Sequence, residues 1–229
     1  VGSEMCIRDS KEGAGNGTAS ALSFGTGGES GTYYAFGGVL ASFVSGKSNC
    51  KVTALTSGGS QANVEDLTNG NVQLAFVQSD VMNYAYNGQR LFDSPVTGFS
   101  VVAQLYQEQV QIVTTNPDIK TVADLAGKKV SIGAAGSGVY FNAIDVLSAY
   151  DLKESDISAV YQSFGDSAES LKDGKIDAAF IVAGAPTTAI TALATAGSVY
   201  LVSLDDSHVQ SLLSASPYYT AATIKAGTY

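Results

Sequence analysis

The chain alternates between two kinds of apolar pattern. Short apolar or alternating runs predict β-strands, and segments with apolar residues every three or four positions predict α-helices. We expect strands at 21–25, 51–56, 73–77, 100–106, 109–115, 129–133, 158–162, 176–182 and 199–203, and helices at 32–45, 60–69, 80–87, 138–150, 165–173, 186–196 and 205–214. Strands that alternate with helices of this length predict an α/β fold with mainly parallel sheets.

Two segments about a hundred residues apart repeat one another. LTNGNVQLAFV at 67–77 and LKDGKIDAAFI at 171–181 share Leu, Gly, Ala and Phe, and β-branched residues, at the same spacing. Gly-rich turns also follow a strand in each half. We therefore predict two α/β lobes of similar build, residues 21–115 and 116–215, with 216–229 returning to the first. Open α/β folds bind ligands at the carboxyl ends of their strands, so we expect a ligand cleft at the hinge between the lobes.

The first twenty residues do not fit this pattern. Residues 1–10 show no apolar periodicity, and the string MCIRDS resembles the translation of a sequencing adapter. We therefore exclude this leader from the fold as a scar that replaces the true N-terminus. Residues 11–20 are typical of a flexible tether, such as follows a secreted or lipid-anchored leader.

Composition narrows the classes of partner. Twelve basic against 21 acidic side chains give a formal net charge of −9, which argues against nucleic acid or an anionic membrane surface as partner. The single histidine, His208, excludes a His-rich metal site. Cys6 and Cys50 are not expected to form a disulfide. We expect no cofactor and no bound metal.

The turn at 133–138 is the best candidate for binding chemistry. A strand runs into Gly133, Gly136 and Gly138, and a helix follows, with Ser137 expected at its N-cap. A helix N-terminus presents unpaired N–H groups and about half a positive charge, so it holds an anion without a basic side chain. This matters in a chain whose two arginines are Arg8 and Arg90. The alternative is an ordinary tight strand-to-helix connection.

Five segments together resemble one family. They are GTGGESGTYYAFGG, TSGGSQANVEDLTNGNVQLAFVQSDV, IKTVADLAGKKVSIGAAGSGVYFNA, LKDGKIDAAFIVAGAP and PYYTAATIKAGTY, in that order, within residues 21–229. They resemble the TAXI family of solute-binding proteins of TRAP transporters. The resemblance implies two periplasmic-binding-protein-like lobes and an extracytoplasmic receptor, periplasmic or lipid-anchored. It also implies capture of a small anionic solute, such as glutamate, glutamine or a related carboxylate, and its delivery to a TRAP permease. The family's chains continue past the last segment, so we expect this chain to be truncated there, and we expect a monomer.

The resemblance also indicates ligand-facing residues in the first half. The first turn supplies Gly27, Gly28, Glu29, Ser30 and Gly31. Glu29 either accepts a hydrogen bond from a ligand ammonium or is a solvated acid at a helix start. Tyr33 is expected in the cleft, where a ring with a hydroxyl can stack on and hydrogen-bond a solute.

Further polar residues follow the next two strands of the first half. Ser57 and Asn63 are either ligand donors or parts of an ordinary helix capped by Ser60. Gln78, at a strand end, is placed to bind a carboxylate or amide, whereas Asp80 is expected to cap the next helix.

The second half contributes a matching set. Ser137, Gly138 and Val139 are the expected carboxylate site. Ala183 and Gly184 end a strand, where small residues let a ligand approach the backbone. Pro186 is expected at the first position of the next helix.

Motifs for catalysis are missing. The dinucleotide pattern from Gly25 requires Gly at position 30, which is Ser30, and GAAGSGVY lacks the Lys of a P-loop. No G-x-S-x-G elbow occurs, and the single histidine, His208 near the C-terminus, is a poor base for any serine nucleophile. We therefore favour a transport receptor and expect no catalytic residue. The alternative is a sensor or enzyme that acts on a small acid on the same scaffold.

Overall fold

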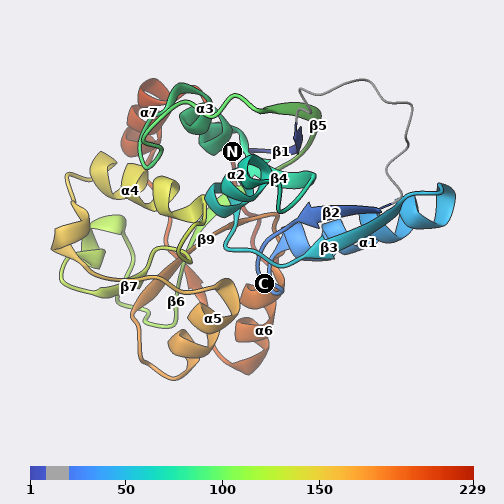
Figure 1. The fold of residues 1–229 in the computed structure, drawn as a ribbon. Coiled ribbons are helices and arrows are strands. Elements are labelled where there is room, and N and C mark those ends of the chain that lie inside the picture. Colours follow the sequence, from blue (N-terminus) through green and yellow to red (C-terminus); the bar gives the residue numbers. More distant parts are fainter. Residues whose placement is uncertain (9–20) are drawn as a thin grey trace. The chain divides into compact units, whose positions relative to one another are not determined.

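The computed structural model describes residues 1–8 and 21–229. The predicted tether at 11–20 lies outside the described residues. The chain divides into two compact units, residues 2–106 and residues 107–229 with Val1. Each unit is an α/β structure built on one five-stranded sheet with helices on both faces, which confirms the predicted α/β fold class (Figure 1). Both sheets are mixed, with parallel and antiparallel strand pairs, whereas mainly parallel sheets were predicted.

The first unit has the strand order β3-β2-β4-β1-β5. β2 runs parallel to β3 and β4, and β1 pairs antiparallel with β4. α1 packs on one face of the sheet, and α2 and α3 lie together on the other. The elements are β1 (Gly2–Arg8), β2 (Ala21–Gly25), α1 (Thr32–Lys47), β3 (Lys51–Leu55), α2 (Ser60–Asn69), β4 (Leu74–Gln78), α3 (Ser79–Asn87) and β5 (Phe99–Gln107).

The second unit has the strand order β10-β6-β9-β7-β8. β7 runs parallel to β8 and β9, and β6 pairs antiparallel with β9 and β10. The elements are β6 (Gln109–Thr114), the 3₁₀ turn η1 (Val122–Leu125), β7 (Lys129–Ser131), α4 (Val139–Ala149), η2 (Glu154–Asp156), β8 (Ser158–Val160), α5 (Phe164–Lys172), β9 (Ala178–Ala183), α6 (Thr188–Ala196), β10 (Tyr200–Leu201) and α7 (Asp206–Ala215).

The two sheets share one topology, which confirms the repeat expected from the sequence. β3-β2-β4-β1 in the first unit corresponds to β8-β7-β9-β6 in the second, with the fourth strand antiparallel in both. The repeated turn is also the same: Gly70 and Gly174 both have positive φ, at 78° and 66°. In each turn the next N–H, that of Asn71 or Lys175, reaches back to the preceding helix, at 2.9 and 2.8 Å.

Alternation along β9 builds the core of the second unit. Phe180 and Val182 point to the face covered by α4 and α7, and Ile181 and Ala183 point to the face covered by α5 and α6. Because both faces are covered, the strand is a continuous run of buried residues, as expected for a central strand.

The structure differs from the sequence-based expectations at the ends of the lobes. Residues 2–8, which we excluded as a leader, form β1 in the interior of the first sheet, and Cys6 is fully buried there. The antiparallel partner of β1 is β4, and its place in the sheet is the one that β6 takes in the second unit.

The boundary between the lobes also differs. The expected boundary at 115/116 lies at 106/107, because β6 pairs with β9 and β10 in the second sheet. Residues 216–229 lie against the second unit and not the first: the hydroxyl of Tyr219 donates to Asp145 on α4 at 2.9 Å.

Candidate functional site

The loops after β2, β3 and β4 gather at one edge of the first sheet, because three parallel strands end there. The N–H of Ser57 donates to the carbonyl of Gly27 at 3.3 Å, and the N–H of Gln78 donates to the Ser60 hydroxyl at 3.0 Å. The structure therefore brings the predicted residues of the first half together. They are Gly27, Gly28, Glu29, Ser30, Gly31, Tyr33, Ser57, Asn63 and Gln78.

Hydrogen bonds within this edge use two of the predicted ligand donors. Asn63 is fully buried, and its amide nitrogen donates to the carbonyls of Thr26 and Phe76, each at 2.7 Å. The Ser57 hydroxyl donates to the carbonyl of Thr26 at 3.1 Å and accepts the N–H of Gly59 at 3.1 Å. Both side chains therefore hold the loops of the first unit together, a structural role that differs from the Ser60-capped helix considered as the alternative.

The helix starts in the first unit also differ in detail from the expectation. Gly59, and not Ser60, is the N-cap of α2. Ser60 instead holds the end of β4 through Gln78. The Oδ1 of Asp80 accepts the N–H of Val81 at 2.9 Å, inside the first turn of α3.

Tyr33 and Glu29 occupy contrasting environments. The ring of Tyr33 lies in an aromatic core cluster, 5.0 Å from the ring of Phe76, and packs against Gly27. Tyr33 is only 9% exposed, so its ring packs in the core against the glycine turn and does not face solvent. Glu29 is exposed and precedes the N-cap of α1, Gly31.

In the second unit, residues 133–139, here called the Ser137 turn, connect β7 to α4. Gly133 has φ +92° and Gly136 has φ +78°, and the N–H of Ser137 closes the turn onto the carbonyl of Ala134 at 3.0 Å. A Cβ on Gly133 would lie 2.5 Å from the Ser137 Oγ and 2.6 Å from the Val139 Cβ. Only glycine fits there.

The Ser137 hydroxyl is the unusual group of this turn. Ser137 is 5% exposed, and its Oγ has no hydrogen-bond partner among the described residues. The N-cap of α4 is Gly138 and not Ser137, and it makes no side-chain cap hydrogen bond. The first N–H groups of a helix have no acceptor within the helix, so an unpartnered hydroxyl lies beside a set of donors. This arrangement suits an oxyanion.

Ala183 ends β9 and Gly184 follows it, at the same edge of the sheet as the Ser137 turn, since β9 and β7 are parallel neighbours. Ala183 is 2% exposed and belongs to the core, whereas Gly184 is partly exposed. Pro186 precedes the N-cap of α6, Thr187, and is not at the first helical position.

The sequence did not indicate three residues that hold the turn after β9: Gln111, Thr187 and Tyr229. Their side chains form a hydrogen-bonded cluster. The only signal in the sequence was polar residues in otherwise apolar strand and helix starts.

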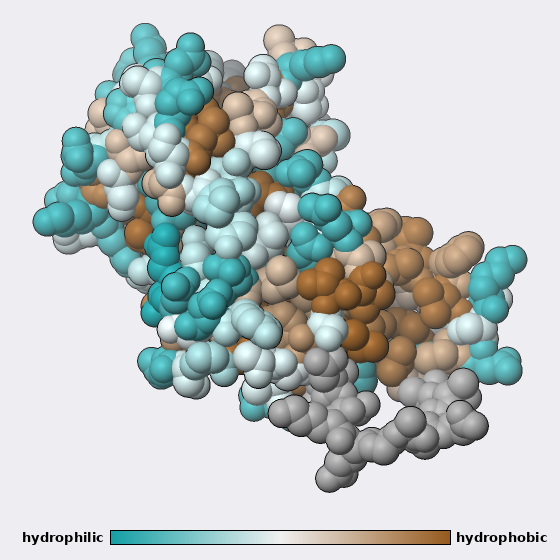
Figure 2. Space-filling model, turned by 90° about the horizontal axis from the view of Figure 1, so that it is seen from above, coloured by the Kyte–Doolittle hydropathy of each residue, from teal (hydrophilic) through white to brown (hydrophobic). Residues whose placement is uncertain are grey.

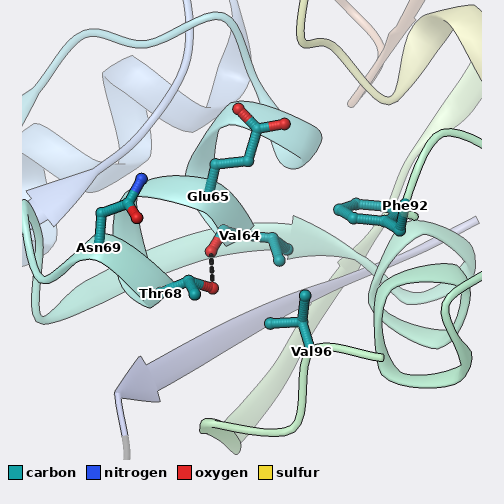
Figure 3. Close-up of a pocket in the computed structure, with 6 residues that line it drawn as sticks. All are labelled: Val64, Glu65, Thr68, Asn69, Phe92 and Val96. Carbon is teal, nitrogen blue, oxygen red and sulfur yellow. Dashed lines mark hydrogen bonds between the residues drawn. The ribbon is translucent and has the colours of Figure 1, made fainter. Parts of the chain in front are cut away.

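A small pocket lies elsewhere in the first unit, between α2 and the segment after α3 (Figure 3). Phe92 and Val96 face Val64 there, and the Thr68 hydroxyl donates to the carbonyl of Val64 at 2.8 Å. Its volume is about 120 Å³. Pockets for small molecules typically hold at least about 300 Å³, and none of the predicted site residues lines this one.

The described ranges 1–8 and 21–229 contain neither a metal cluster nor a membrane-spanning helix. No cluster of three His, Cys, Asp or Glu side chains is arranged to hold a metal ion. No helix in these ranges is both long enough and apolar enough to cross a bilayer.

The repeated α/β units, with loops gathered where parallel strands end, define the fold of the periplasmic solute-binding proteins. The chain belongs to the NMT1-like family, whose model matches residues 24–229.

Solved structures show the same fold at low sequence identity. One is the alkanesulfonate-binding protein SsuA from Xanthomonas axonopodis pv. citri bound to MOPS, with 21% identity and a TM-score of 0.54 over 82% of this chain and 61% of that one. An ancestral arginine-binding protein bound to glutamine has 18% identity and a TM-score of 0.58 over 82% and 80%. A putative L-cystine ABC transporter from Listeria monocytogenes has 18% identity and a TM-score of 0.52 over 80% and 77%. The chain thus spans only 61% of the length of SsuA.

Proposed function

We propose that the protein is a non-enzymatic extracytoplasmic solute receptor that binds a small carboxylate at the Ser137 turn. The observation that carries this proposal is the buried, unpartnered Ser137 hydroxyl beside the N-terminus of α4. The fold is that of proteins that bind sulfonates and amino acids, and family membership supports the same class. Neither the helix N-terminus nor the hydroxyl requires an arginine to bind the anion.

Titration calorimetry tests the proposal and separates the candidate ligands. The probes are L-glutamate, L-glutamine and succinate as carboxylates, and MOPS as a sulfonate. We expect stoichiometric binding of at least one carboxylate and no binding of MOPS. Preferential binding of MOPS would overturn the carboxylate assignment. A titration with no heat of binding for any of the four probes would overturn the proposed receptor role.

Ser137→Ala tests the position of the anion. A hydrogen bond to a charged group contributes about 1.5–3 kcal/mol, so we expect the affinity to fall by about 10- to 100-fold. Ser148→Ala is the matched control, because Ser148 is exposed near the other end of α4. Equal affinities of the two variants would place the anion elsewhere.

Recovery of unchanged ligand after long incubation with the protein distinguishes a receptor from an enzyme.

We further propose that the receptor delivers its solute to a membrane permease of the TRAP type. The support is the order of five sequence segments that resemble the TAXI family. Uptake of the bound solute by vesicles that carry such a permease, with and without the receptor, tests this step. Uptake that does not depend on the receptor would contradict it.

A further inference from the structure

The turn that follows β9 is held by a closed ring of hydrogen bonds. The amide nitrogen of Gln111 donates to the Thr187 hydroxyl at 2.9 Å, and the N–H of Thr187 donates to the Tyr229 hydroxyl at 3.0 Å. The Tyr229 hydroxyl in turn donates to the Oε1 of Gln111. Three segments far apart in the sequence therefore meet at one point.

The ring is buried and reaches the candidate site. Gln111 is 2% exposed and Thr187 is fully buried, so each donor or acceptor left without a partner would carry a desolvation penalty. The Thr187 hydroxyl donates to the carbonyl of Gly184 at 2.8 Å. The ring thus ends on the backbone of a residue at the same sheet edge as the Ser137 turn.

The orientation of the Gly184 carbonyl affects anion binding at this edge of the sheet. A carbonyl oxygen carries partial negative charge, so one that faced the ligand would oppose binding. The Thr187 hydroxyl holds this oxygen in a hydrogen bond. Without the Tyr229 hydroxyl, Thr187 loses the acceptor of its N–H, and the turn is held by fewer hydrogen bonds.

We propose that Tyr229 is a positioning residue for the solute site: through Thr187 it fixes the Gly184 turn in the orientation that accepts an anion. This inference rests on the proposed function. It assigns to Tyr229 no contact with the solute.

Tyr229→Phe tests the proposal, because it removes the hydroxyl and keeps the ring. Hydrogen exchange measured by NMR on the whole chain reports the ring directly: we expect the Thr187 amide to exchange faster, since its acceptor is gone. Calorimetry with L-glutamate and succinate reports the site: we expect a dissociation constant about three- to tenfold higher, as for loss of one hydrogen bond.

Two controls separate positioning from general stability. Tyr200→Phe removes a phenol from β10, which pairs with the opposite end of β6, and should leave both readouts unchanged. Thr187→Ser keeps the hydroxyl and the N–H and should bind like the wild type, whereas Thr187→Val should bind like Tyr229→Phe.

The outcomes distinguish this proposal from the proposed function. Faster exchange at Thr187 together with weaker binding supports the positioning role. Unchanged exchange, or faster exchange with unchanged affinity, overturns it and leaves the receptor intact. If the wild-type protein binds neither carboxylate, the positioning role is overturned together with the binding of these solutes.

Discussion

Gly133 shows how one residue determines the shape of the candidate site. Its φ of +92° lies where side chains are disfavoured, and the space that a Cβ would need is taken by Ser137 and Val139. The backbone therefore turns sharply enough to bring the Ser137 hydroxyl over the start of α4.

Gly133→Ala should accordingly lower both stability and binding. A side chain at an incompatible backbone conformation costs more than about 1 kcal/mol, and the two close contacts add to it. Chemical denaturation measures the loss. Gly197→Ala is the control, because Gly197 has extended backbone and open space around its Cβ position. Equal stabilities of the two variants would contradict this account of the turn.

At the level of residues, the sequence predicted where the loop clusters lie better than it predicted what each side chain contacts. Gly and Ser at strand ends located both loop clusters, because turn chemistry is local. The roles of Asn63 and Tyr33 depend on what lies across the sheet: a carbonyl of β4 takes the amide of Asn63, and Phe76 takes the ring of Tyr33. Such contacts are not encoded in local pattern. For the same reason the sequence missed Tyr229, which lies 118 residues from its partner Gln111.

The start of α7 illustrates an element held by a carboxylate. Asp205 is the N-cap, and its side chain accepts the N–H of His208. The Ser207 hydroxyl, and then the His208 ring and N–H and the Tyr150 hydroxyl, hold the pKa of Asp205 well below its usual range. The ring of Tyr150, which follows α4, stacks on His208 at 3.7 Å. The carboxylate thus joins α7 to the end of α4.

The sign of the pH dependence follows from this lowered pKa. A carboxyl whose pKa is lowered on folding stabilises the protein above its unfolded pKa of about 4, and this contribution is lost as the pH falls toward the folded value. Asp205→Asn keeps a capping side chain and removes the charge. We expect its melting temperature to be lower than that of the wild type at pH 7, with the difference shrinking below about pH 4.

Asp93→Asn is the control for this prediction, because Asp93 is an exposed carboxylate of the other unit. Its melting curve should follow that of the wild type at each pH. A difference between wild type and Asp205→Asn that stays constant from pH 7 to pH 2 would show that the charge does not stabilise α7.

At the level of elements, apolar periodicity predicted nearly the whole order of strands and helices. The repeated segments at 67–77 and 171–181 were informative, because each is the end of a helix, a left-handed glycine and a central strand. The exception is β1, where GSEMCIR has too few β-branched residues to indicate a strand. Its pairing with β4 on one side and its place beside β5 on the other override that weak local preference.

On the scale of the whole molecule, the outer face of α1 is unusually apolar. Phe36, Val39 and Phe43 recur at helical spacing and are 38%, 66% and 64% exposed. Figure 2 shows apolar residues gathered on the side of the view where α1 lies. Large exposed apolar patches bind hydrophobic probes and promote association.

A Val39→Thr, Phe43→Ser double variant tests the behaviour of this face. We expect weaker fluorescence of a bound hydrophobic dye and less light scattering at high protein concentration, with stability changed by less than about 0.5 kcal/mol per site, as at other surface positions. Tyr86→Ser is the control, since Tyr86 is a 53% exposed aromatic residue on α3. Equal dye binding by the double variant and the wild type would mean that the face is not the dominant apolar surface.

The division into two units could be predicted from the sequence, but its boundary could not. The internal repeat indicates two similar sheets, since each copy needs its own neighbours to bury its apolar strand. Which sheet takes β5 and which takes β6 depends on strand pairing across long sequence distances. The segments 100–106 and 109–115 follow each other without a helix, and nothing in their residues shows that the chain passes from one unit to the other between them.

The pairing of β1 with β4 has a practical consequence for anyone who handles the protein. Ser3 lies opposite Gln78, so β1 begins at the edge where β2, β3 and β4 end. Deleting residues 2–8 to attach an affinity tag would leave one side of β4 without its partner strand. Because an unpaired strand edge promotes aggregation, purification handles should leave this segment intact.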